Sequence, residues 1–165
     1  MTDDFINNYF IQEKIESLIF AIIGLVDISV SFIFWFIIKY SFYKGMAYPI
    51  FIIGFIQILV GGVVYMRSPQ DIIRVEQILK FEPIKMKTEE IPRINKVIKN
   101  FEIYKWIEIC FIFFGSILFI FCKKTNLSFW KGIGLGLLIQ AMLMLALDIV
   151  AEKRAKIYCN IIQKI

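Results

Sequence analysis

Long apolar runs alternate with polar, charged sequence along this chain of 165 residues. The four runs occupy residues 17–38, 47–66, 103–122 and 129–150. A helix rises about 1.5 Å per residue, so a run of about twenty residues crosses the roughly 30 Å hydrocarbon core of a bilayer. The pattern therefore predicts an all-α fold: an integral membrane four-helix bundle that runs up-down-up-down.

The connection 67–102 is the longest segment between two runs, and its helix signals predict cytoplasmic helical extensions. Ser68 stands before a proline, which predicts a new helix that runs to about Lys80. Thr88 precedes two glutamates and predicts a second start, which leads into the third span, and a start at Ile91 is the alternative. The last helix should likewise continue past the fourth run, through Tyr158.

The N-terminal segment carries apolar side chains ahead of the first run. Phe5, Ile6, Tyr9 and Phe10 are predicted to lie on the membrane interface, and an ordinary frayed terminus is an equal alternative. The segment is acidic and lacks the basic region and cleavage site of a secretory signal, so the first span should be retained. We expect a single transmembrane domain, residues 1–165.

The basic residues predict the orientation of the spans. With four spans, one side holds both termini and the long connection, and 14 of the 19 lysines and arginines lie there. The positive-inside rule then places the termini and the connection in the cytoplasm. Across the first span alone, the acidic N-terminus against Lys39 and Lys44 favours the reverse, and we let the larger total decide. The short loops fit a bacterial inner membrane.

Small and polar residues are not scattered within the runs; they recur on one face of each predicted helix. Such stripes let helix backbones approach closely and allow hydrogen bonds between helices, so they should face a common interior. The stripes contain Ser17, Gly24, Asp27 and Ser31; Gly54, Gln57 and Gly61; Tyr104, Glu108, Gly115 and Cys122; and Gly134, Ala141 and Asp148.

One group of polar residues is predicted near the middle of the bilayer. It consists of Asp27, Gln57 and Gln140, with Ser31 close by. A carboxylate at this depth costs at least about 2.5 kcal/mol, so Asp27 must be protonated, hydrogen-bonded or hydrated. The group is a candidate proton or cation site, and the alternative is a buried hydrogen-bond network that sets the helix register.

A second group is predicted at the cytoplasmic edge of the spans. Glu108, Asp148 and Glu152 supply carboxylates, and the cations within reach are Lys105, Arg67, Lys153 and Arg154. Asp148 and Glu152 are one helical turn apart and require a cation nearby, from Arg67 or from the third helix. Structural ion pairs are the favoured interpretation of this cluster.

No catalytic, metal or cofactor motif accompanies these groups. Histidine is absent, and the three cysteines include no CxxC pair. There is also no phosphate-binding loop and no GxSxG nucleophile motif. We therefore expect no catalytic residue, no metal and no cofactor, and an enzyme is disfavoured.

Three classes of function remain open. The first is a non-enzymatic accessory, assembly or interaction protein. The second is a small oligomeric transporter of protons, cations or solutes that uses Asp27, and the third is a lipid-modifying membrane enzyme. The expected partners are the bilayer, anionic lipid at the cytoplasmic face, and a second copy or another membrane protein; nucleic acid is not expected. We favour the first class.

Overall fold

The computed structural model describes residues 2–122 and 127–164, and only the backbone of residues 2–4. The chain forms α1 (Thr2–Phe36), α2 (Ser41–Phe81), α3 (Ile91–Phe121) and α4 (Ser128–Ile162), and the short π-helical turn η1 (Met86–Glu90) leads into α3. The described residues form no strand, which confirms the all-α prediction. Lys123 and Lys124, part of the charge comparison, lie outside the described residues.

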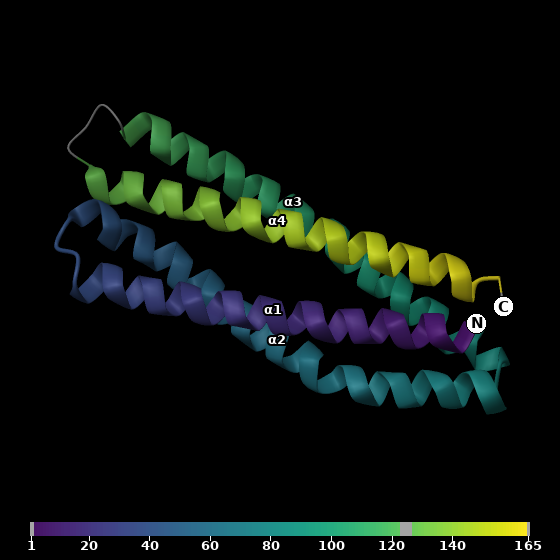
Figure 1. Ribbon diagram of the computed structural model, residues 1–165. Helices are drawn as coiled ribbons and strands as arrows, with labels where there is room; N and C mark the ends of the chain where they lie inside the picture. The colour runs from purple at the N-terminus through teal and green to yellow at the C-terminus, as the bar shows by residue number, and fades with distance from the viewer. Residues whose placement is uncertain (1, 123–126, 165) are drawn as a thin grey trace.

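All four helices are long and apolar enough to cross a membrane, and they indicate an integral membrane protein. Their lengths of 31 to 41 residues correspond to about 46 to 62 Å, well beyond the hydrocarbon core. Figure 1 shows the N-terminal end of α1, the C-terminal end of α4 and the α2–α3 connection at one end of the molecule, and the α1–α2 connection and the facing ends of α3 and α4 at the opposite end. Most of the helix length beyond the apolar runs therefore lies at the end that holds the α2–α3 connection.

The helix start predicted at Ser68 is wrong, because α2 continues through this residue. Ser68 is not a cap: its hydroxyl donates to the backbone oxygen of Val64, one turn earlier. Pro69 lies inside the helix, where it removes only one backbone hydrogen bond. Figure 1 shows that α2 bends along its length, as a helix does at an internal proline. The helix ends at Phe81, before Pro83.

The third helix begins at Ile91, and the start predicted at Thr88 is also wrong. Residues Met86–Glu90 wind as a π-helical turn directly before it. The Thr88 hydroxyl contacts the backbone oxygen of Ile84, 3.4 Å away, and caps no helix. The π turn matters because it places Glu90 in the interior of the protein.

Glycines make the close contacts between the helices. α1 packs along α2, α3 packs along α4, and α2 also packs against α4, whereas α1 and α4 touch only sparsely. A Cβ atom added at Gly24 would lie 2.5 Å from the backbone oxygen of Gly54, and one at Gly115 would lie 2.8 Å from that of Gly134. At the α2–α4 crossing, a Cβ on Gly132 would collide with the Phe42 backbone oxygen. The small-residue stripes thus serve these pairwise contacts.

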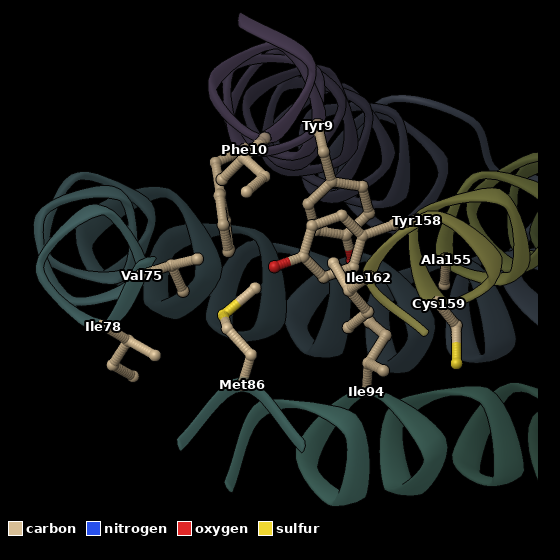
Figure 2. Packing of buried hydrophobic residues seen from close by; sticks show 11 residues of the cluster. Tyr9, Phe10, Val75, Ile78, Met86, Ile94, Ala155, Tyr158, Cys159 and Ile162 are labelled. Atoms are coloured by element: carbon tan, nitrogen blue, oxygen red, sulfur yellow. The ribbon is translucent and has the colours of Figure 1, made fainter. Parts of the chain in front are cut away.

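The main hydrophobic core lies beyond the four apolar runs, in what we call the head: residues 5–16, 67–102 and 151–162. Helix ends from every part of the chain meet there (Figure 2). The interpretation of the N-terminal apolar residues as interfacial or frayed is wrong, because Tyr9 and Phe10 are buried and Tyr9 stacks on Tyr158. The core consists of Ile6, Tyr9, Phe10, Val75, Ile78, Met86, Ile94, Ala155, Tyr158, Cys159 and Ile162.

Candidate functional site

The midplane residues come together where α1, α2 and α4 meet. The close crossing of α1 and α2 sets Asp27 against Gly54, since a Cβ there would lie 2.7 Å from the Asp27 Cβ. Gln57 is fully buried, and its Nε2 lies 3.3 Å from the sulfur of Met144 on α4. Gln140, one turn before Met144, is buried within hydrogen-bonding reach of the Asp27 carboxyl group.

Several oxygen acceptors of this midplane group have no donor within the described residues. Asp27 Oδ2, Gln57 Oε1 and Gln140 Oε1 are each buried and have no hydrogen-bond partner within the described residues. Ser31 does not fill the deficit, because its hydroxyl donates 2.8 Å to the backbone oxygen of Asp27. Unpartnered acceptors of this kind suit a proton, a cation or a water molecule.

The edge group is centred on the interface of α3 and α4. Glu108 of α3 and Asp148 of α4 are buried and face each other. Glu152, one turn further along α4, pairs with Lys105 of α3 and with Lys156, whose Nζ lies 2.7 Å away. These two ammonium groups hold the pKa of Glu152 below its usual range. The cation next to the α4 carboxylates therefore comes from the third helix.

The two arginines assigned to the edge group lie elsewhere. Arg67 pairs with Asp71 on its own helix, at 2.9 Å, and more distantly with Glu13 of α1. Arg154 pairs with Glu16 of α1 and lies over the ring of Tyr9. Both arginines join α1 to the rest of the head, so they stabilise the head and leave the Glu108–Asp148 pair without their charge.

Glu90 is the centre of a buried ion network that the sequence analysis did not find. Its side chain is 0% exposed and accepts four hydrogen bonds. Arg93 donates two, at 2.6 and 2.9 Å, Arg74 donates one at 2.9 Å, and the hydroxyl of Tyr158 donates one at 3.0 Å. Burial and the neighbouring Glu90 charge raise the pKa of Tyr158, so this hydroxyl keeps its proton and remains a donor.

The positive and negative charges of this network are equal in number. Arg74 also pairs with Asp71, which Arg67 joins to Glu13. Three cations and three carboxylates therefore form one connected set, and the buried charge of Glu90 is tolerated because it is matched. The spacing of Asp71 with Arg74 and of Glu90 with Arg93 was visible in the sequence, but only as ordinary helix-surface pairs.

A surface hollow of about 480 Å³ lies at the tip of the head. Phe81, which is 78% exposed, forms part of its wall, and Ile84, three residues further along the chain, is equally exposed. The other lining residues are Arg74, Gln77, Ile78, Glu82, Lys85 and Glu89, so charges of both signs surround the apolar patch. A second hollow, of about 350 Å³, is lined by apolar side chains of α3 within its span, where lipid would contact it.

Chemical and evolutionary comparisons add no further assignment to these sites. Within the described residues, no three Cys, Asp or Glu side chains form a group that could hold a metal ion. Comparison of the chain with known protein families, curated proteins and solved structures finds no match. The function is therefore argued from the residues alone.

Proposed function

We propose that the four helices cross a bacterial inner membrane as an up-down-up-down bundle, with the head in the cytoplasm. The positive-inside count supports this orientation, because 14 of the 19 basic residues belong to the end of the molecule that carries the head. The mixed ion network of the head also suits an aqueous environment better than hydrocarbon.

Cysteine labelling tests this orientation. In a variant whose three native cysteines are replaced by serine, a cysteine at exposed Glu89 should react with a membrane-impermeant maleimide only after the cytoplasmic side is opened. A cysteine at Tyr40, which is exposed in the α1–α2 connection, should react in intact cells. The opposite labelling pattern would invert the proposed topology.

We further propose that the protein is non-enzymatic and acts through contacts of its head with a protein partner. The observation that carries this proposal is the exposed apolar patch at the tip. Phe81 lies fifteen residues past the second run, up to about 22 Å beyond the hydrocarbon boundary, so lipid does not cover it. An exposed Phe–Ile pair ringed by charges resembles the apolar centre and polar rim of a protein interface.

Position-specific cross-linking tests the contact. A photoreactive amino acid placed at Phe81 in the full-length protein, in its own membranes, should give one discrete cross-linked product. The same amino acid at Lys96, which is exposed elsewhere on the head, should not give it. An Ile84→Glu substitution should abolish the product while leaving the helix content unchanged. Equal products from both positions, or none at all, would contradict the proposal.

Transport through Asp27 is the second candidate, and the unpartnered oxygens of Asp27, Gln57 and Gln140 favour it. The Asp27→Asn variant separates the two functions. If the protein acts by contact, the variant should retain the Phe81 cross-link, and vesicles with either protein should show the same proton permeability. A proton flux that wild-type protein supports and Asp27→Asn abolishes, with the fold intact, would make transport the function.

A further inference from the structure

The interface of α3 and α4 buries two acidic side chains against each other. Glu108 is 5% exposed and Asp148 is 9% exposed. Each lies one helical turn from the Lys105–Glu152 ion pair that joins α3 to α4, so the two carboxyl groups face each other across the interface. Such proximity is costly if both groups are ionised, because like charges repel strongly where water is excluded.

The hydrogen bonding of the pair is incomplete without a proton. Carboxylate oxygens only accept hydrogen bonds, so two facing carboxylates cannot bond to each other. Both Glu108 oxygens are buried and have no partner among the residues that the structure describes. One proton on either group converts the contact into a strong O–H···O bond to the other carboxylate.

The surrounding charges do not neutralise the pair. The charged groups next to it are Lys105 of α3 and Glu152 of α4. Glu152 takes Lys105 as an ion-pair partner, together with the half-exposed Lys156. Three carboxyl groups thus face two ammonium groups, and one negative charge is left over.

We infer that Glu108 and Asp148 together bind one proton at neutral pH, as a carboxylic acid hydrogen-bonded to a carboxylate. The bound proton makes the cluster with Glu152, Lys105 and Lys156 electrically neutral. The Glu90 network needs no such proton, because its three carboxylates meet three arginines. Release of the proton at higher pH leaves an unmatched buried charge, which weakens the α3–α4 contact.

Infrared spectroscopy of the full-length protein in vesicles tests the inference without any mutation. A carboxylic acid C=O band should be present at neutral pH, shift in heavy water and disappear when the pH is raised. Difference spectra against Glu108→Gln and against Asp148→Asn should each show the loss of one such group, because either change leaves two carboxylates with two lysines. A band that is the same in wild type and in both variants overturns the inference.

Lys105→Gln provides a test of opposite sign. It removes a cation and leaves three carboxyl groups with one lysine, so the carboxylic acid band should grow by about one further group. A purely structural role for the pair predicts no such gain, and an unchanged or smaller band overturns the inference. Circular dichroism on each variant verifies that the helices are intact, and Asp27→Asn, which alters the midplane group, should leave the Glu108–Asp148 signal in place.

The same proton predicts a pH dependence of stability. The folded pair binds a proton that the separated carboxyl groups of the unfolded chain release at neutral pH, so the folded state binds more protons and stability falls as the pH rises. Wild-type protein should lose thermal stability from mildly acidic to mildly alkaline pH, and Asp148→Asn should lose much less. Equal slopes for the two proteins would contradict the inference.

Discussion

Glu90 illustrates how a single buried charge organises the head. The carboxylate is inaccessible to water, and Arg74 and Arg93 match its charge while Tyr158 donates a further hydrogen bond. The neighbouring Glu89 is exposed. Two adjacent and chemically identical residues thus have opposite environments, and the difference arises from the π turn that positions them.

This contrast predicts the result of a matched pair of substitutions. Glu90→Gln should lower the free energy of unfolding by about 3 kcal/mol, because it leaves Arg93 without its carboxylate and removes one of the two carboxylates that Arg74 faces. Glu89→Gln should change it by less than about 0.5 kcal/mol, as is usual for an exposed position. Denaturant unfolding of the purified protein in detergent measures both. A similar loss in the two variants would show that the buried network contributes little.

At the scale of whole helices, glycines decide which pairs can approach. Gly132 of α4 lies against the Phe42 backbone of α2, and there is no room for even a methyl group. Gly62 of α2 has no atom within 4 Å of the position that a Cβ would take. Both are glycines in apolar runs, but only the first is required for packing.

Alanine substitutions should separate these two positions. Gly132→Ala should lower the free energy of unfolding by about 1–3 kcal/mol, because the helices must move apart. Gly62→Ala should be neutral or slightly stabilising, since alanine favours the helix. Thermal unfolding in detergent distinguishes the two outcomes. Equal destabilisation would mean that the α2–α4 crossing is looser than described.

The molecule as a whole consists of four continuous helices that serve two environments. The same helices are long and apolar enough to cross a membrane and also build the head, with the aromatic residues of α1 at its centre. Phe10 is fully buried and lies under the guanidinium of Arg93. Because no flexible linker separates the head from the spans, we expect the two parts to unfold together.

Phe10→Ala tests that expectation. Loss of a buried phenylalanine should cost about 3–5 kcal/mol. If the head and the spans unfold as one unit, the loss of helix content and the onset of trypsin cleavage in the head should occur at one temperature. That temperature should be lower than in the wild-type protein. The exposed Ile11, mutated to alanine, is the control and should have little effect. A head that becomes protease-sensitive while the spans keep their original melting temperature would show two independent units.

The four apolar helices and the polar residues within them follow from the amino-acid sequence alone. In hydrocarbon every backbone hydrogen bond must be made inside the helix, so length and apolarity alone identify such segments. The positions of Asp27, Gln57 and Gln140 along their helices were equally visible. These are local properties, and they do not depend on which helices meet.

Which residues face one another depends on how the helices pack and could not be predicted from the sequence. The Ser68–Pro69 signal was overridden, because continuing α2 carries Val75 and Ile78 into the head core, where burial outweighs one missing hydrogen bond. Glu90 could not be recognised as buried, since its arginine and tyrosine partners come from three separate helices. The pairing of Glu108 with Asp148, rather than with the arginines, has the same cause: helix contacts select partners, and sequence spacing does not.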